Sequence, residues 1–304
     1  MNKIFKAIRL IKYKPNIFLS ILLVRLGSLF PDKLYLKLMF RCKMGYWMNF
    51  NNPKTFSEKL QWLKLYDRNP LYTTLVDKYA VKKWVAEKIG KEYVIQTLGV
   101  WENFNEIDLE KLPNQFVLKC THDSGGLVIC KNQKYLDVVS SSKKINNSLN
   151  RNYYYTWREW PYKNVKPRII AEQYMEDESG ELRDYKFFCF DGIVKVLFIA
   201  SDRQNKDEET KFDFFDRDFN HLPFSNGHPN ACISPQKPRM FEKMVELAEI
   251  LSKGIPHVRV DFYEVGSQIF FGEMTFFHWS GFVPFKPKSW DYKFGEWLHL
   301  PSRR

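Results

Sequence analysis

FVLKCTHDSGGLVIC, residues 116–130, places two short apolar runs on either side of a polar turn. The first run ends in Lys119, and the turn contains residues that can contact a phosphate: His122, Ser124, Gly125 and Gly126. A glycine turn lets backbone N–H groups approach phosphate oxygens, and a lysine adds a point charge beside them. The stretch contains neither GxxxxGK[ST] nor GxGxxG. It therefore indicates a phosphate clamp of another kind, although a plain β-hairpin turn explains the same glycines.

The chain around this turn alternates helical and extended patterns. Helical spacing is found over residues 4–45, 51–69, 71–90, 137–160 and 240–254. Strand-like runs cover residues 93–101, 168–175, 184–190, 193–201, 212–216, 257–265 and 268–277. This order predicts a mixed α+β fold with antiparallel pairing in the second half. The segment 71–90 is expected to be one helix that carries Asp77 and Lys78 and stops at Gly90.

Charged residues recur two apart on the expected strands of the second half. Arg259 and Asp261 share one strand face, and Glu273 and Thr275 share a face of the next strand. Adjacent carboxylates repel unless a positive charge lies between them. Arg259 can supply that charge, and so can Mg²⁺, which binds one or two carboxylates together with substrate phosphates.

Two further strands end in charged residues. Glu172 lies at the end of the β-branched run RIIAEQYM, and Asp184 and Lys186 share a face of DYKFFCF. A strand-edge glutamate and an ordinary Asp-Lys pair account for these residues equally well. Their meaning depends on the order in which they follow the glycine turn.

Size and composition are those of a globular protein. The chain has 304 residues, with 44% hydrophobic and 27% charged residues. Its five cysteines show no CxxC spacing, which favours reduced thiols in the cytoplasm over a disulfide framework or a zinc site. Aromatic residues reach 17%, and Trp157, Trp160, Trp279 and Trp290 are candidates for stacking on sugar rings.

Most of the net charge of +12 lies at the front of the chain. Residues 1–75 hold ten Lys and four Arg against three acidic residues, which leaves +11 there. This pattern suits phospholipid head groups, nucleic acid or an acidic glycan, and it equally suits a solvated helical face. The apolar stretch 17–30 includes Arg25 and is shorter than the ~20 residues of a spanning helix. We expect a cytoplasmic protein with peripheral contact at the inner face of the membrane, and no nucleic-acid partner.

The succession of these residues resembles the ATP-grasp superfamily. Within it, the chain is similar to the TupA-like branch, found among bacterial surface-polysaccharide biosynthesis proteins. The resemblance runs from about Asn51 to the C-terminus. Its most specific pieces are TFSEKLQWLKLYDR, DKYAVKKWV, FVLKCTHDSGG, DYKFFCFDG, VRVDFY and FGEMTFF.

The resemblance implies an ATP-grasp fold, in which two α+β subdomains hold ATP between them. It suggests a helical extension over 1–75, a small subdomain over 76–175 and a C-terminal subdomain over 176–304. Lys78 and Lys119 would contact the α- and β-phosphates, under a lid formed by residues 121–126. The hinge strand that reads the adenine and ribose would contain Glu172, Gln173, Tyr174 and Met175, with Asp184 also near the nucleotide.

The remaining roles implied by the resemblance belong to the transfer step. Asp261, Glu273 and Thr275 would hold Mg²⁺, while Arg259 and Lys186 would stabilise the transferring γ-phosphoryl group. In many superfamily members Asn stands where this chain has Thr275. Many members also begin with a Rossmann-like substrate domain, and residues 1–75 show no βαβ pattern.

The implied reaction is amide formation driven by ATP. Transfer of the γ-phosphoryl group to a carboxylate gives an acyl phosphate, which an amine then attacks. The family context suggests a uronic acid of a glycan or its precursor as the carboxylate, and an amino acid or another amine as acceptor. Rival hypotheses are a glycosyltransferase that uses Asp216 and Asp218 as an Asp-x-Asp metal motif, a sugar kinase, and a membrane-associated scaffold without catalysis.

Overall fold

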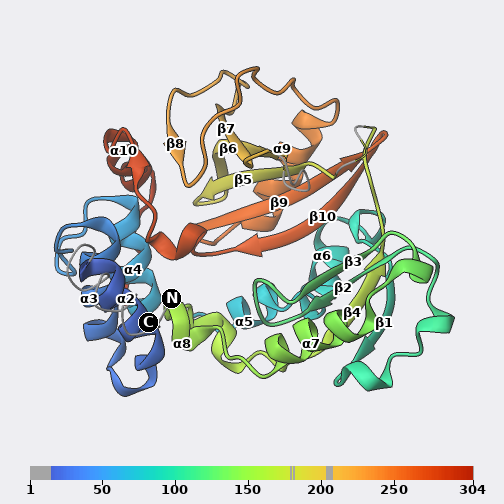
Figure 1. Ribbon diagram of the computed structural model, residues 1–304. Helices are drawn as coiled ribbons and strands as arrows, with labels where there is room; N and C mark the ends of the chain where they lie inside the picture. The colour runs from blue at the N-terminus through green and yellow to red at the C-terminus, as the bar shows by residue number, and fades with distance from the viewer. Residues whose placement is uncertain (1–14, 179, 181, 203–207, 304) are drawn as a thin grey trace.

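Two antiparallel sheets form the centre of the computed structural model, which describes residues 15–178, 180, 182–202 and 208–303 (Figure 1). The smaller sheet has the order β1-β4-β2-β3 and consists of β1 (Thr97–Trp101), β2 (Phe116–Cys120), β3 (Leu127–Cys130) and β4 (Ile169–Gln173). The larger sheet has the order β10-β9-β5-β6-β7 and consists of β5 (Asp184–Phe190), β6 (Ile193–Ser201), β7 (Lys211–Asp216), β9 (His257–Val265) and β10 (Gln268–Thr275). The predicted α+β class with antiparallel pairing is confirmed.

The larger sheet is covered on both faces, which explains its almost continuous apolar strands. Every residue of β5 is buried, and successive side chains point to opposite faces. The ring of Phe187 packs toward Phe241 of α9 (Phe241–Ser252), with 6.2 Å between ring centroids. The ring of Phe188 packs on the other face against Phe294 of α10 (Ser289–Trp297), at 5.3 Å.

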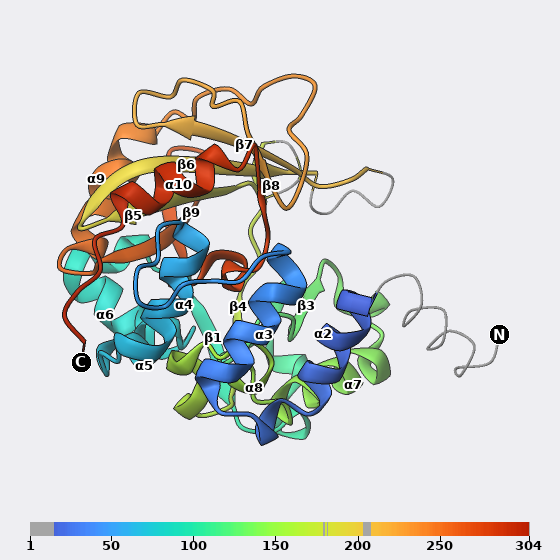
Figure 2. The same cartoon turned by 90° about the vertical axis from the view of Figure 1, so that its left-hand side faces the viewer.

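The front of the chain is helical, as predicted. Its described helices are α2 (Pro15–Arg25), α3 (Asp32–Met44) and α4 (Phe56–Tyr66). Figure 2 shows α2 and α3 next to each other on the face that is turned toward the viewer. The basic residues Lys3, Lys6, Lys12 and Lys14 lie outside the described residues. Within the described part of the chain, no helix combines the length and apolar character needed to cross a bilayer.

Helix α4 joins this front end to the larger sheet. A capping box starts it: the Thr55 side chain accepts from the Glu58 N–H, and the Glu58 carboxylate accepts from the Thr55 N–H. In the same first turn, the Ser57 hydroxyl donates to Asp291 of α10 at 2.9 Å. Residues 56–66 therefore pack with the C-terminal half rather than standing apart from it.

The single helix predicted over residues 71–90 is wrong, because the structure has two helices there. They are α5 (Leu71–Val76) and α6 (Ala80–Ile89). The Asp77 carboxylate causes the break, since it accepts from the N–H groups of Tyr79 (2.9 Å) and Ala80 (3.2 Å). Lys78 therefore lies in a turn between helices, where its N–H donates to the Thr121 carbonyl at 3.1 Å.

Two helices and a short ribbon complete the fold around the two sheets. Helix α7 (Val138–Leu149) covers the smaller sheet and starts at Asp137, whose carboxylate accepts from the Ser140 N–H at 2.9 Å. The short α8 (Tyr154–Trp157) leads back to β4. A two-stranded ribbon of β8 (Ser225–Asn226) and β11 (Phe285–Lys286) closes the far end of the larger sheet.

Candidate functional site

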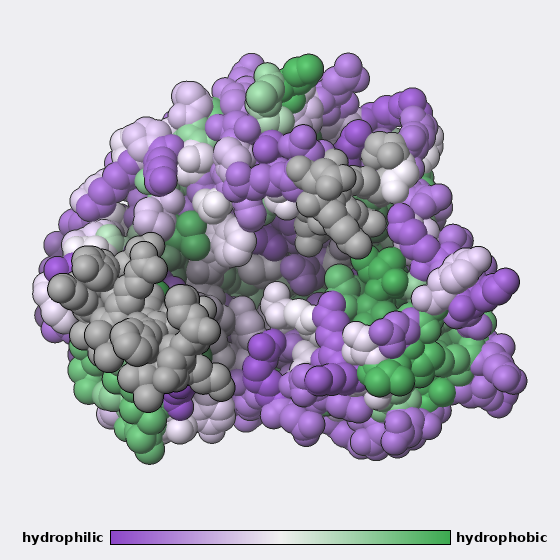
Figure 3. All heavy atoms as spheres, in the orientation of Figure 1, coloured by the Kyte–Doolittle hydropathy of each residue, from purple (hydrophilic) through white to green (hydrophobic). Residues whose placement is uncertain are grey.

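Two cavities lie between the sheets. The smaller encloses about 200 Å³ against the face of the four-stranded sheet, and the larger encloses about 500 Å³. The walls of the larger cavity come from both halves, with Lys78, Asp123 and Ser124 facing Lys186 and Arg259. Figure 3 shows hydrophilic residues around the hollow between the two halves of the molecule.

The smaller cavity is apolar with a charged end. Val117, Leu127 and Ile129 contribute apolar walls, and Lys119 and Glu172 contribute charge. In the register of β2 and β4, Val117 is opposite Glu172 and Lys119 is opposite Ile170, so Lys119 and Glu172 share a sheet face. The Lys119 Nζ lies 2.6 Å from the Glu172 carboxylate.

Glu172 also binds a second lysine, which the sequence did not single out. The Nζ of Lys82, on α6, lies 2.5 Å from its carboxylate. Burial alone would raise the pKa of Glu172, but Lys119 and Lys82 outweigh it and lower this pKa to about 2. Lys82 lies inside DKYAVKKWV, but its contact with Glu172 depends on how α6 packs beside β4, so the sequence carried no signal for it.

The residues predicted as a hinge lie around the same cavity. Glu172, Gln173, Tyr174 and Met175 all line it. Only the first two belong to β4, and the next two lead out toward β5. The structure thus brings this whole segment next to Lys119.

The glycine turn is built around Asp123. The carbonyl of Asp123 accepts from the Lys78 Nζ at 2.6 Å, and its carboxylate accepts from Ser148 and from Arg151 (3.2 Å). Gly125 has φ +137°, and a Cβ at Gly126 would lie 2.6 Å from the Cys120 Sγ. Both glycines are therefore needed for the turn to fold against β2.

His122 and Ser124 differ in direction. Ser124 is exposed and lines the larger cavity. The His122 ring is 2% exposed, and its Nε2 lies 3.1 Å from the Ser148 carbonyl and 3.2 Å from the Arg151 carbonyl. His122 thus contacts the end of α7 and lines neither cavity.

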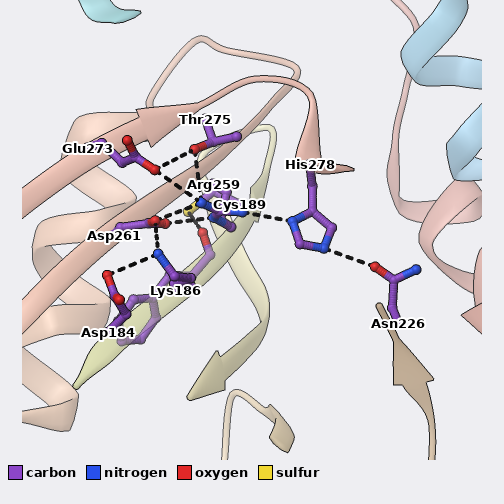
Figure 4. A network of polar contacts seen from close by, with 10 residues as sticks. Asp184, Lys186, Cys189, Asn226, Arg259, Asp261, Glu273, Thr275 and His278 are labelled. Atoms are coloured by element: carbon purple, nitrogen blue, oxygen red, sulfur yellow. Dashed lines mark hydrogen bonds and ion pairs between the residues drawn. The ribbon is translucent and has the colours of Figure 1, made fainter. Parts of the chain in front are cut away.

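The charged residues of the larger sheet form one network, drawn in Figure 4. Glu273 pairs with Asp261 across β9 and β10, and Thr275 pairs with Arg259, which confirms the shared face predicted from spacing. Arg259 grips Asp261 through two bonds of 2.7 Å, and its Nη2 donates to the Thr275 hydroxyl at 3.0 Å. Two cations, Arg259 and Lys186, thus separate the carboxylates.

Lys186 stands between two carboxylates. Its Nζ lies 2.5 Å from Asp261 and 3.0 Å from Asp184. Burial lowers the pKa of Lys186 more than Asp261 raises it. Burial would raise the pKa of Asp261, but Arg259 and Lys186 hold this pKa below its usual value.

His278 and Asn226 extend the network and were missed from sequence. Arg259 Nη1 and His278 Nδ1 are 2.7 Å apart, and His278 Nε2 lies 3.0 Å from the Asn226 Oδ1. Burial and the Arg259 charge lower the pKa of His278 well below its ordinary value, so the ring is neutral. Nδ1 therefore accepts from the guanidinium and Nε2 donates to the amide. The pairing joins residues distant in the chain, so spacing gave no signal.

The candidate metal ligands are unequally available. Among the described residues, no group of three or more His, Cys, Asp or Glu side chains is arranged to hold a metal ion. Both oxygens of Asp261 already accept from Arg259 or Lys186. The Glu273 side chain is 39% exposed, and its contact with Arg259 is longer, at 3.5 Å, so it is more available to a metal ion. Glu273 suits a Mg²⁺ that takes its other ligands from phosphates. Asp261 would have to share oxygens that now bind cations.

The aromatic side chains proposed for stacking fall into two groups. Trp157 and Trp279 line the larger cavity. Trp160 is 9% exposed and packs near Tyr72, with 6.0 Å between ring centroids. Trp290 stacks on Phe224 at 4.4 Å. Neither ring is exposed enough for the expected stacking on a sugar, because Trp160 is buried and Trp290 is half-buried against the core.

Comparison with protein-family models gives a match over most of the chain. The TupA-like ATPgrasp model covers residues 58–299, which include both sheets and all of the charged clusters above. The chain belongs to the TupA-like ATP-grasp family. Curated proteins gave no match.

Several solved structures are similar to this TupA-like ATP-grasp chain. A D-alanine–D-alanine ligase from Bacillus anthracis complexed with ATP is 13% identical, with a TM-score of 0.39, and the match covers 66% of this chain and 53% of the ligase. The same enzyme from Helicobacter pylori is 14% identical over 81% of this chain and 69% of that one, with a TM-score of 0.41. The ligase PsnB, complexed with minimal precursor, Mg and ADP, is 10% identical over 72% and 57%, with a TM-score of 0.38. This chain thus spans only 53% of the length of the Bacillus anthracis ligase and 57% of the length of PsnB.

Proposed function

We propose that this protein is an ATP-dependent ligase that joins a carboxylate to an amine through an acyl phosphate. The observation that supports the proposal is the pair of cavities. An apolar cavity with Lys119 at its charged end suits a nucleotide, and the larger cavity brings Lys78, Lys186 and Arg259 together. Lysines and backbone N–H groups that converge in a cavity are suited to a triphosphate.

The residues divide the work by charge and position. Lys119 and Lys78 neutralise the α- and β-phosphates, and residues 172–175 contact the base and ribose. Arg259 and Lys186 offset the charge that develops on the transferring phosphoryl group. Ser124 and the glycines after it cover the phosphates and exclude water, which would otherwise hydrolyse the acyl phosphate.

Mg²⁺ would be held by Glu273, with Asp261 and Thr275 as further candidate ligands. The ion would offset repulsion between the carboxylate substrate and the triphosphate. Lys78 lies close enough to Glu273 to act on it. Burial disfavours the ionised carboxylate, but Lys78, with help from Lys186 and Arg259, lowers the pKa of Glu273. The side chain therefore stays an anion that can bind a cation.

The substrate class proposed is a uronic acid of a surface polysaccharide or its precursor, with an amino acid or another amine as acceptor. Trp157 and Trp279 in the wall of the larger cavity support a sugar ring there. The rival Asp-x-Asp motif receives less support. Asp216 accepts from the N–H groups of Asp218 (3.0 Å) and Asn220 (2.8 Å), as expected for a turn that closes on itself.

The reaction can be tested by product analysis. The protein is incubated with ATP and MgCl₂, with glucuronate, galacturonate or UDP-glucuronate as donor, and with amino acids as acceptors. Hydroxylamine replaces the amine in a parallel set, where an acyl phosphate gives a hydroxamate. The proposal predicts ADP release that needs the carboxylate, and a product with the combined mass less one water. A phosphorylated sugar would identify a kinase, and UDP release without ATP cleavage would identify a glycosyltransferase.

We also propose that the helical front end contacts an anionic membrane surface. Leu29 is 74% exposed and Trp47 is 56% exposed, and basic side chains lie between them on α3: Lys33, Lys37 and Arg41. Apolar and basic side chains together suit the interface of an anionic bilayer. Sedimentation with phosphatidylglycerol vesicles, but not with phosphatidylcholine vesicles, is expected. Sedimentation with neither kind of vesicle, or equal sedimentation with both, would contradict this part of the proposal.

A further inference from the structure

The larger cavity has an end that the ATP site does not explain. Its wall there is formed by Tyr153, Trp157, Tyr162 and Trp279, and one carboxylate, Glu159, stands among these rings. Glu159 is 4% exposed, and its carboxylate accepts a hydrogen bond from the Ser280 hydroxyl. In the described part of the chain, Glu159 forms no ion pair within 4.0 Å, and the nearby buried Lys64 acts on it only across a longer distance. A buried carboxylate without an ion-pair partner, facing a cavity, is suited to a cationic ligand.

Strained backbone holds this carboxylate in place. Arg158, directly before it, has φ +59°, while Trp279 and Ser280 have φ +49° and +54°. A non-glycine residue is strained in this conformation because its Cβ approaches a backbone carbonyl oxygen. Two separate segments thus accept strained geometry at the point where Glu159 and Ser280 meet.

The Lys64 side chain links these two segments by hydrogen bonds. Its Nζ donates to the Trp157 carbonyl at 2.9 Å and to the Ser280 carbonyl at 2.8 Å. A third bond, of 3.0 Å, goes to the Gln61 side chain. These three bonds use the three donors of Lys64 on two backbone carbonyls and the Gln61 amide oxygen, so none of them goes to the Glu159 carboxylate.

Glu159 is also electrically linked to the transfer site. Burial raises its pKa above the usual range, and Lys64, Ser280 and Arg259 oppose this rise only in part. Arg259 and Glu273 both act on Glu159, so it lies within electrostatic reach of the proposed phosphoryl-transfer residues. A carboxylate in such a setting can accept a proton near neutral pH.

We propose that Glu159, supported by Ser280 and Tyr153, is the subsite for the acceptor amine, which binds as a primary ammonium ion. This inference rests on the proposed ligase function and names the place of the second substrate. The aromatic walls add attraction for a cation. Because the cavity continues to Arg259 and Glu273, an amine held at Glu159 faces the acyl group.

The step balances with Glu159 as proton acceptor. The ammonium ion gives one proton to the Glu159 carboxylate, and the nitrogen lone pair forms the C–N bond. The C–O bond of the acyl phosphate breaks, and phosphate leaves with the electron pair. A second nitrogen proton goes to the leaving phosphate, and Glu159 returns its proton to water.

Calorimetric titration of Glu159→Gln tests this assignment. Individual amino acids, ethanolamine and putrescine are titrated into wild type and variant, each with and without Mg–AMPPNP. At least one amine is expected to bind wild type and to bind Glu159→Gln at least tenfold more weakly. Wild-type binding should weaken as pH falls below the pKa of Glu159, and the variant should lack this dependence. Glu87→Gln, an exposed carboxylate on α6 (62% exposed), is the matched control and should behave as wild type.

Each other result has a distinct meaning. Equal affinity of wild type and Glu159→Gln for the amine would overturn the assignment, and so would nucleotide binding with no amine binding. Absence of nucleotide binding would count against the ligase function. The amine titrations without nucleotide would still test whether Glu159 binds the amine. If Glu159→Gln fails to fold, Ser280→Gly replaces it. Glycine accepts the positive φ of that position while the hydroxyl is lost, so several-fold weaker amine binding is expected.

Discussion

The smaller and larger sheets each carry a buried charge cluster, and the two clusters have opposite balance. At the smaller sheet, Lys119 of β2 and Lys82 of the adjacent α6 share the single carboxylate of Glu172. On the larger sheet, three carboxylates (Asp184, Asp261 and Glu273) surround Arg259 and Lys186. The first cluster has one positive charge in excess, which suits an anionic ligand, and the second has one negative charge in excess, which suits a cation. Together they suit the two halves of a magnesium nucleotide.

The largest expected effect comes from breaking the cluster of the larger sheet. Asp261→Asn removes the carboxylate that holds both Arg259 and Lys186, and it leaves two buried cations without their main partner. We expect a loss of about 3–5 kcal/mol in the free energy of unfolding. Urea denaturation measures this loss, with Asp218→Asn in an exposed turn as the control. A loss below about 1 kcal/mol would show that the cluster does not depend on Asp261.

Breaking the cluster of the smaller sheet should cost less. Glu172→Gln leaves Lys82 and Lys119 side by side without a counter-charge, but Lys119 is 21% exposed and can turn toward solvent. A loss of about 1–3 kcal/mol is expected. The matched control is Glu102→Gln, which removes an exposed ion pair with Lys166 and should change stability by less than about 1 kcal/mol. Equal effects of the two substitutions would refute the buried pairing.

The same carboxylate should make stability fall in acid. The pKa of Glu172 is about 2 in the fold, below the ordinary glutamate value of 4.5. A lowered folded-state pKa gives stability that is present above the unfolded-state value and lost as pH falls through the folded-state value. Between about pH 5 and pH 2, wild type should therefore lose more stability than Glu172→Gln. Parallel curves for the two proteins would contradict the lowered pKa.

A smaller effect separates two roles of Thr275. Its hydroxyl accepts from Arg259 at 3.0 Å and lies 3.5 Å from Glu273. Thr275→Val should cost about 1 kcal/mol of stability through the lost hydrogen bond. If the hydroxyl is also a metal ligand, the Mg²⁺ concentration needed for half-maximal ADP release should rise several-fold. An unchanged requirement would restrict Thr275 to positioning Arg259.

The sequence predicted what depends on local spacing. The two-residue repeats placed Arg259 with Asp261 and Glu273 with Thr275, because strand geometry fixes which side chains share a face. The glycine turn was also recognised from local sequence, because glycine is the residue that the backbone at positions 125 and 126 accepts. Local spacing failed at Asp77, since one carboxylate that accepts two N–H groups interrupts a helical pattern without changing its periodicity.

Contacts between distant segments could not be predicted. Lys82 reaches Glu172, and His278 joins Arg259 to Asn226, only because of how the sheets and helices pack. Glu159 follows an aromatic cluster that suggests core packing, and its burial beside Ser280 depends on strained backbone in two segments. The sequence therefore indicated the nucleotide side of the site better than the acceptor side.

The most direct test of the account is a thermal-shift titration with Mg–ATP on wild type and Lys119→Ala. Bound ligand stabilises the fold by RT ln(1 + [L]/Kd), about 2.7 kcal/mol at a hundredfold excess over Kd. Lys111→Ala, which alters a lysine that is 83% exposed, is the control. The account predicts a higher Tm with Mg–ATP for wild type and Lys111→Ala, and little or no change for Lys119→Ala. A shift with UDP-sugars but none with Mg–ATP, or an equal Mg–ATP shift in Lys119→Ala, would contradict it.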